Sequence, residues 1–261
     1  MDATLTIGYK PSVICEETNG RQAVPTGVMC SNGSLFGPLW LCARNLIEVK
    51  PLIDPVDIMQ ALARRRPVFH SEADFQHAFA WEIHRSAPEC DIRLEVPVRA
   101  TTGAIHLDLL ARLTLGQMAI ELKYKTRSLT AALNGEDFNL MSHAAQDLGR
   151  YDFFKDLNRI EAFALAGPER TGYAIFLTND SAYWKAPSAV GHGYAGFAMN
   201  DGRNIAGNLC WGERASEGTR RGRQEDVGIR GCYRLQWMPY SSLAVKSYGE
   251  FRYLCVQAAS A

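Results

Sequence analysis

Residues 105–125, IHLDLLARLTLGQMAIELKYK, decide the fold that the sequence predicts. Apolar side chains recur at every second position on both sides of Thr114-Leu115-Gly116-Gln117, which predicts two β-strands. On the first strand they are expected to face one way at Ile105, Leu107, Leu109, Ala111 and Leu113. The four residues between the strands suit a turn, because Gly116 is free to adopt a positive φ. The stretch is therefore expected to form a β-hairpin.

The expected register brings acidic and basic side chains together. A turn closed around Leu115-Gly116 pairs residue 114 with 117, so Asp108 falls opposite Lys123 and residue 110 opposite Glu121. Asp108 and Glu121 are then diagonal neighbours, roughly 7–8 Å apart at Cα. Two carboxylates at this separation can hold one hard cation, and an ammonium group beside it can position a water.

The alternative is an ordinary solvent-facing hairpin, on which a cross-strand ion pair contributes little. However, Leu110 and Ala119 share the predicted face of the charged residues, so this face is at least partly covered. A covered carboxylate pair without a cation would be costly.

Asp108 followed by Glu121-Leu122-Lys123 resembles the D…(D/E)-x-K signature of the PD-(D/E)XK, or restriction-endonuclease-like, nuclease superfamily. Leu107 stands where the name-giving motif has proline, which lowers the specificity of the match. The resemblance covers roughly residues 68–180. It implies an α/β fold with a restriction-endonuclease-like core that runs helix, three-stranded meander, helix, strand, with a mixed central sheet flanked by helices.

The resemblance also implies an activity, the hydrolysis of DNA phosphodiester bonds with Mg²⁺ or Mn²⁺. Asp108, Glu121 and the backbone carbonyl of Leu122 would hold the metal, and Lys123 would orient the attacking water or stabilise the transition state. Glu72 and Gln146 would complete the catalytic set.

Glu72 belongs to a helix that Ser71 is expected to cap, with Asp74 as the acidic half of a capping box. Glu72 and Glu82 both lie on the predicted core side of this helix. Family members tend to carry the helix-borne acid near the helix start, which favours Glu72. Glu82 and a solvated role for both remain open. Asp54-Pro55 is expected to open a shorter helix that ends at about Arg65.

Gln146 is predicted on a later helix, capped by Ser142 and ending at about Ala166. Gln146…Tyr151 resembles the Gln-x-x-x-Tyr motif of exonuclease-like members, but its spacing is one residue longer, so only Gln146 is carried over. An exposed helical glutamine is the alternative. Before this helix, residues 134–137 are expected to be a loop, and after it residues 172–180 read as a buried strand.

The chain is expected to divide into an irregular N-terminal extension (1–54), the nuclease-like core (55–185) and a β-rich C-terminal extension packed on that core (186–261). Strands are expected near 194–200, 203–212, 229–238 and 250–257. The basic run at residues 220–223 predicts a flexible loop that is either solvated or bound to phosphates.

Composition sets limits on the function. The formal net charge is zero, whereas nucleic-acid binders usually carry a basic surplus. The start of the chain has no signal-peptide pattern, and no apolar run is long enough to cross a membrane. The seven cysteines show no C-x-x-C spacing, which favours reduced thiols. A cytoplasmic location is therefore expected.

We therefore expect a metal-dependent deoxyribonuclease, in repair, restriction or defence. DNA is the expected partner, with RNA left open, no membrane partner, and room for a homodimer and for a separate ATPase or recognition subunit. The alternatives are a non-catalytic nucleic-acid-binding or assembly module on the same fold, and a hydrolase of small phosphoesters. Sequence specificity and exo- or endonucleolytic action are not readable from the chain.

Overall fold

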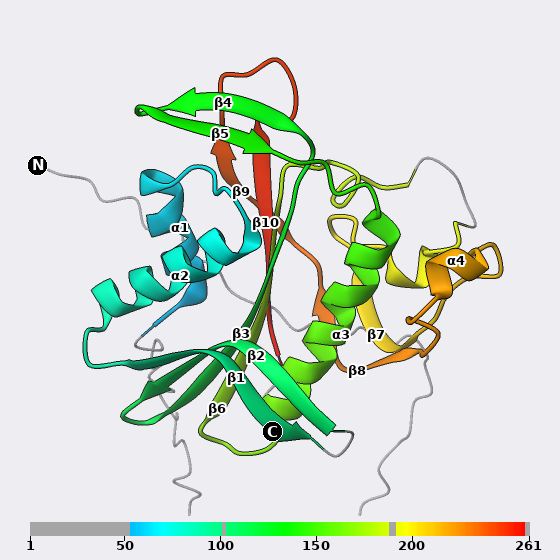
Figure 1. Cartoon of the computed structure of the whole chain (residues 1–261). Coiled ribbons are helices and arrows are strands. Elements are labelled where there is room, and N and C mark those ends of the chain that lie inside the picture. Colours follow the sequence, from blue (N-terminus) through cyan, green and yellow to red (C-terminus); the bar gives the residue numbers. More distant parts are fainter. Residues whose placement is uncertain (1–52, 101–102, 188–191, 259–261) are drawn as a thin grey trace, which may run out of the picture. The chain divides into compact units, whose positions relative to one another are not determined.

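The computed structural model of the protein describes residues 53–100, 103–187 and 192–258, which belong to one compact unit, Leu52–Ala261. The expected N-terminal extension, 1–54, lies outside the described residues except for Ile53 and Asp54. The described chain is mixed α/β, as predicted, and its central sheet is mainly antiparallel (Figure 1).

The central sheet has six strands in the order β1-β2-β3-β6-β10-β9, and only β3 and β6 run parallel to each other. The strands are β1 (Asp91–Ala100), β2 (Gly103–Leu113), β3 (Gly116–Lys125), β6 (Arg170–Thr178), β9 (Trp237–Ser242) and β10 (Glu250–Gln257). Strand β6 is buried along most of its length, as its apolar sequence predicts.

Three longer helices cover the two faces of this sheet: α1 (Pro55–Arg65), α2 (Glu72–Ser86) and α3 (Gln146–Ala164). Two of the three predicted N-caps are confirmed, because the Asp54 side chain accepts the Val56 N–H and the Ser71 side chain accepts the Asp74 N–H. The predicted start of α3 at Ser142 is wrong. His143 is instead held to the end of β3, where its N–H donates to the Thr126 carbonyl and its Nδ1 accepts the Thr126 N–H.

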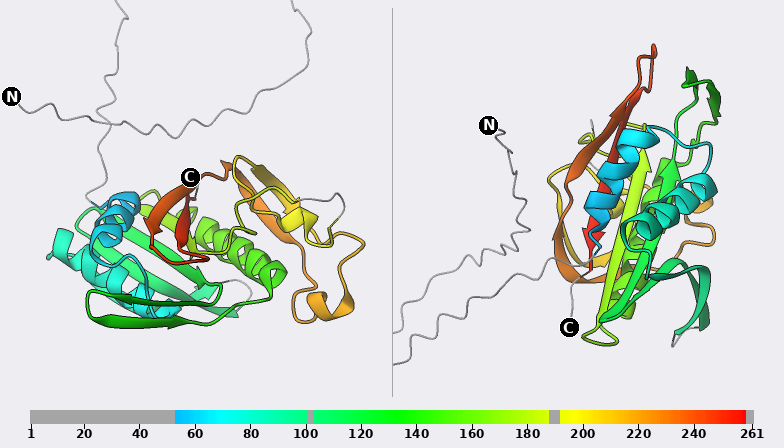
Figure 2. Two further views of the ribbon diagram at one scale, coloured as in Figure 1. Left: turned by 90° about the horizontal axis from the view of Figure 1, so that it is seen from above. Right: turned by 90° about the vertical axis from the view of Figure 1, so that its left-hand side faces the viewer.

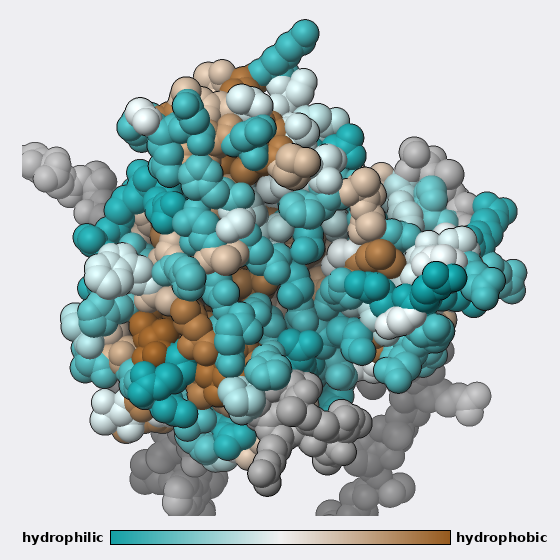
Figure 3. All heavy atoms as spheres, in the orientation of Figure 1, coloured by the Kyte–Doolittle hydropathy of each residue, from teal (hydrophilic) through white to brown (hydrophobic). Residues whose placement is uncertain are grey.

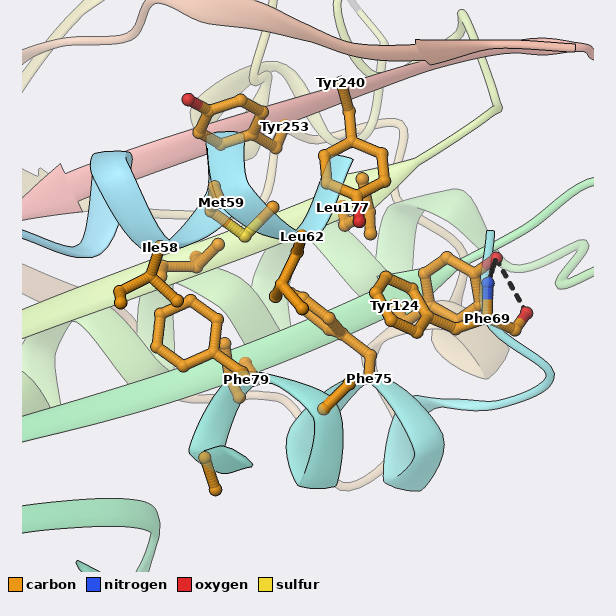
Figure 4. Close-up of a cluster of buried hydrophobic side chains, with 14 of the residues drawn as sticks. Ile58, Met59, Leu62, Phe69, Phe75, Phe79, Tyr124, Leu177, Tyr240 and Tyr253 are labelled. Carbon is orange, nitrogen blue, oxygen red and sulfur yellow. Dashed lines mark hydrogen bonds between the residues drawn. The ribbon is translucent and has the colours of Figure 1, made fainter. Parts of the chain in front are cut away.

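Helices α1 and α2 lie on one face of the sheet and α3 on the other (Figures 1 and 2). Alternate residues of β3 and β6 point to opposite faces of the sheet. Leu122 and Ile175 pack with α1 and α2, whereas Phe176 packs with α3. Figure 4 shows the core on the α1–α2 side, where the Tyr124 hydroxyl donates to the Phe69 carbonyl at 3.0 Å. The face seen in Figure 3 is mostly hydrophilic, with an apolar patch over the meander strands.

The predicted loop at residues 134–137 is confirmed only at residues 134–135, which form the turn between β4 (Leu129–Leu133) and β5 (Glu136–Leu140); residues 136–137 belong to β5. This two-residue turn has φ +52° at Asn134 and +82° at Gly135, the Asn-Gly conformation typical of tight hairpins. The hairpin packs on the start of α2, where the His70 ring stacks on Phe138 with centroids 4.4 Å apart.

The C-terminal segment contributes to two sheets. Strands β10 and β9 extend the central sheet, whereas β7 (Asn204–Leu209) and β8 (Val227–Arg234) form a separate pair on the α3 side. The strand predicted at 194–200 is wrong: a 3₁₀ turn, Ala195–Phe197, takes its place, and three consecutive buried residues, 197–199, break the two-residue period. The strand predicted at 229–238 divides at Leu235 between β8 and β9.

The basic segment at residues 220–223 is held by hydrogen bonds on the α3 side. The short helix α4 (Glu217–Arg220) ends in it, and Arg220 donates to the Gly212 carbonyl. Arg223 forms two bonds, of 2.8 and 2.9 Å, to Asp152 of α3. Two of its three arginines are therefore engaged within the fold.

Candidate functional site

The predicted hairpin forms, but its register is two residues away from the predicted one. Leu113 pairs with Gly116, so the turn is Thr114-Leu115, and Leu115 is 91 % exposed. Gly116 is held in the strand because it lies against the Glu169 carbonyl, where a Cβ has no room. The ladder ends at Leu109 and Ile120, so Asp108 and Glu121 are the next residues on the two strands, and the predicted pairing of Asp108 with Lys123 does not form.

Strands β2 and β3 separate beyond Ile120, and side-chain carboxylates there accept hydrogen bonds from backbone N–H groups of β3. The Leu122 N–H donates to Asp108 Oδ2 at 2.7 Å, and the Tyr124 N–H donates to Glu72 Oε2 at 2.9 Å. Because the N–H and C=O of one strand residue point to the same side, the Leu122 carbonyl faces this gap as well. We call the gap, bordered by Asp108, Glu72 and Leu122, the fork.

A backbone irregularity opens the fork. Glu95, which the β1–β2 register sets opposite Asp108, has φ +51°, and Gln76 of α2 donates to both the Asp108 carbonyl (2.7 Å) and Glu95 Oε1 (3.1 Å). The strict alternation predicted for the first strand is broken here, because Leu107 packs with Leu110 and not with Leu109. Buried Gln76, one helical turn after Glu72, is a site residue that the sequence analysis missed.

On the α3 side, two further missed residues meet the predicted ones. Glu121 is 1 % exposed and accepts a 2.7 Å bond from Arg159, while the Lys123 ammonium lies 2.9 Å from Asp156. Arg159 also lies 3.3 Å from Asp156. The signal in the sequence was the spacing of Asp156, three residues after Phe153 and four before Ile160, which places it on the buried stripe of α3.

The cluster is crowded with negative charge. Burial, followed by the charges of Asp156 and Asp108, raises the pKa of Glu121 to about 9, while Arg159 works in the opposite direction. Burial alone would lower the pKa of Lys123, but Asp156, Asp108 and Glu72 raise it above its ordinary value. These mutual effects place Asp108, Glu121, Lys123, Asp156 and Arg159 within electrostatic reach of one another.

The fork offers the ligands that a hard divalent cation takes. Glu121 Oε2 is buried without a hydrogen-bond partner, Asp108 is half-buried, and the Leu122 carbonyl is directed into the gap that Asp108 borders. Mg²⁺ and Mn²⁺ prefer such oxygen ligands. Nowhere among residues 53–100, 103–187 and 192–258 do three His, Cys, Asp or Glu side chains gather as a metal-ligand set. The set that fits here thus has two carboxylates and one main-chain carbonyl.

The structure does not bring every predicted residue to the fork. Glu82 lies at the other end of α2 and pairs with Arg65 of α1 at 2.5 Å. Gln146 donates to Asp180 after β6, and it is ten residues, about 15 Å along α3, from Asp156. Of the two candidate acids on α2, Glu72 is the one beside β3, where it also contacts Lys125 at 3.2 Å.

A cleft of about 260 Å³ lies next to the fork. Residues from the start of α2, the end of β3 and the end of the β4–β5 hairpin line it: His70, Ser71, Glu72, Tyr124, Lys125, Thr126, Asn139, Met141 and His143. Glu72 therefore borders both the fork and this cleft, most of whose lining residues are polar.

Comparisons with family models, with curated proteins and with solved structures find no match for this chain. Among the described helices, none has the length and apolar character needed to cross a membrane.

Proposed function

We propose that this protein is a Mg²⁺- or Mn²⁺-dependent nuclease that hydrolyses DNA phosphodiester bonds, on a restriction-endonuclease-like core. The observation that carries the proposal is that Asp108, Glu121 and Lys123 lie within electrostatic reach of one another where strands β2 and β3 separate. The order α2, β1–β2–β3, α3, β6 supports it, because this is the helix, meander, helix, strand sequence of that core.

Asp108, Glu121 and the Leu122 carbonyl would hold the cation. When bound, it would lower the pKa of a coordinated water and neutralise charge on the phosphate. The bonds from Leu122 and Gln76 fix Asp108 at its carboxylate and its carbonyl, so this ligand is positioned before any substrate arrives.

Lys123 supplies a donor next to these carboxylates. Its Nζ, held by Asp156, can orient a water for attack on phosphorus or donate to a phosphate oxygen as negative charge grows there. The water oxygen forms the new bond to phosphorus and the water gives up a proton to the solvent, while the bond to the leaving sugar oxygen breaks and that oxygen takes up a proton from the solvent. Glu72, bonded to the Tyr124 N–H, borders the approach to the fork.

The test is Mn²⁺- and Mg²⁺-dependent cleavage of single- and double-stranded DNA by the full chain, with EDTA as the metal-free control. Asp108→Asn, Glu121→Gln and Lys123→Ala should each lose cleavage and still unfold cooperatively, well above the assay temperature. Glu82→Gln is the matched control, since Glu82 is another buried, ion-paired carboxylate but lies away from the fork. Parental cleavage rates in all three fork variants would refute the proposal.

One observation favours the non-catalytic nucleic-acid-binding or assembly module as the second candidate. Glu121 already has a cationic partner in Arg159, so the fold satisfies part of the cluster from within. This candidate predicts DNA binding that is insensitive to Mn²⁺ and no cleavage under any metal condition.

A further inference from the structure

Arg159 binds the carboxylate that the proposed metal would need, on the oxygen next to the unpartnered Oε2 of Glu121. Its Nη1 bonds to Glu121 Oε1 at 2.7 Å, and the same nitrogen donates to the His106 carbonyl at 3.3 Å. Its Nη2 lies 3.3 Å from Asp156 Oδ1. The Arg159 side chain is 26 % exposed, whereas those of Glu121 and Asp156 are 1 % and 6 % exposed. Arg159 is therefore the most exposed of these three side chains.

A guanidinium and a divalent cation repel each other, and both are attracted to the same carboxylate. Binding of a cation by Glu121 should thus displace Arg159 from Oε1. Displacement does not leave Arg159 without a counter-ion, because Asp156 holds its other terminal nitrogen. A planar guanidinium anchored on one edge keeps donors free, and it matches the oxygens of a phosphate group.

We propose that Arg159 holds Glu121 in the metal-free site and binds a backbone phosphate of the nucleic acid once a divalent cation has replaced it, with Asp156 as its fixed anchor. This inference rests on the proposed function and names the residue that would receive the substrate phosphate. Arg159 then acts first as the internal counter-ion of Glu121 and afterwards as a phosphate ligand.

Mn²⁺ binding to the full-length protein, measured by the loss of the free-ion EPR signal, is the first test. Arg159→Gln should bind Mn²⁺ roughly fivefold more tightly, the effect of removing one partly exposed competing ion pair. Arg223→Gln is the matched control, since Arg223 also pairs with an acid of α3 and its side chain is 30 % exposed, but its partner is Asp152. Its Mn²⁺ affinity should equal that of the wild type.

DNA binding in Ca²⁺, measured by fluorescence anisotropy, is the second test and should move the opposite way. Arg159→Gln should bind DNA more weakly than the wild type. Arg159→Lys should recover part of this loss, because lysine keeps the positive charge but lacks the planar guanidinium. Thermal unfolding identifies any variant that fails to fold, and Arg159→Lys keeps the test valid if Arg159→Gln is one. A purely structural role would weaken both kinds of binding together.

The outcomes separate this inference from the proposed function. If Arg159→Gln binds Mn²⁺ no more tightly than the wild type, while the wild type binds Mn²⁺ through Asp108 and cuts DNA, only the role of Arg159 is refuted. If the wild type shows no Mn²⁺ binding that Asp108→Asn removes, both proposals are refuted.

Discussion

Asp156→Asn is the substitution that most directly tests how the cluster is held together. The change removes one negative charge and keeps the shape of the side chain. Asp156 lies 2.9 Å from the Lys123 ammonium and 3.3 Å from Arg159, and its side chain is 6 % exposed. The variant therefore takes the nearest counter-ion from Lys123 and the second counter-ion from Arg159, and both cations are half-buried.

The expected loss of stability follows from opposing effects. Removing one partner of a buried ion pair can cost about 3–5 kcal/mol, because the remaining charge is left uncompensated. Here the cost is smaller. Burial raises the pKa of Asp156 and so disfavours its charged form, and Lys123 stays near Asp108 and Glu72. We expect a net loss of about 1–3 kcal/mol, which corresponds to a fall of roughly 2–12 °C in Tm for a domain of this size.

Urea and thermal unfolding measure this loss, and cleavage kinetics well below Tm measure the function. If Lys123 acts as proposed, kcat should fall about tenfold or more, as when a group that orients a catalytic side chain is removed, while KM changes little. Asp152→Asn is the control. Its partly exposed pair with Arg223 should contribute about 1 kcal/mol or less and leave kcat unchanged. An Asp156→Asn protein that is as stable as the wild type would refute the reasoning about this pair.

Three further substitutions test the packing around the site by equilibrium unfolding. Gly172→Ala should lower the free energy of unfolding by about 1–3 kcal/mol, because the new Cβ would overlap the buried Ile160 side chain. Gly228→Ala is the control and should be nearly neutral, because the space around Gly228 is open. Equal effects of the two substitutions would contradict this reasoning. Glu161→Gln should cost about 1–3 kcal/mol, since the carboxylate of Glu161 accepts the N–H groups of Arg230 and Gly231 and the Tyr233 hydroxyl, and an amide nitrogen cannot accept; an unchanged urea midpoint would argue against it. Gly135→Ala should cost about 1 kcal/mol from the backbone alone, because Gly135 has φ +82° and no close neighbours, and a more stable variant would show that this conformation is not strained.

Local signals in the sequence predicted much of the fold. Asp54 and Ser71 cap helices because their side chains bond to residues two and three positions away, so the information is contiguous. Strand β6 was predicted because burial on both faces leaves a continuous apolar run. The start of α3 was missed because His143 bonds to Thr126, seventeen residues away, and no local rule contains that contact.

The site was predicted in its residue types but not in its register or its second half. Gly116 suits a turn, but close contact with the Glu169 carbonyl keeps it in the strand and moves the turn to Thr114-Leu115. Arg159 and Asp156 come from a helix that begins 21 residues after β3 ends, and the parallel pairing of β3 and β6 brings that helix over Glu121 and Lys123. The spacing of Asp156 in the sequence can suggest that its side chain is buried, but it cannot show that this side chain pairs with Lys123 and Arg159.

The charges around the fork bear on the proposed substrate, a phosphodiester. Asp108 and Asp156 carry two negative charges and Lys123 and Arg159 two positive ones, and because the pKa of Glu121 is raised to about 9, this carboxyl holds a proton at neutral pH and the formal sum is zero. In this state the cluster does not attract a phosphate by its net charge. A bound divalent cation would displace the proton of Glu121 and bring the sum to one positive charge, which the single negative charge of a phosphodiester then balances. Substrate affinity should accordingly depend on the divalent cation, and Arg159, whose side chain is more exposed than those of Lys123, Glu121 and Asp156, is the one of these four that the approaching backbone would meet first.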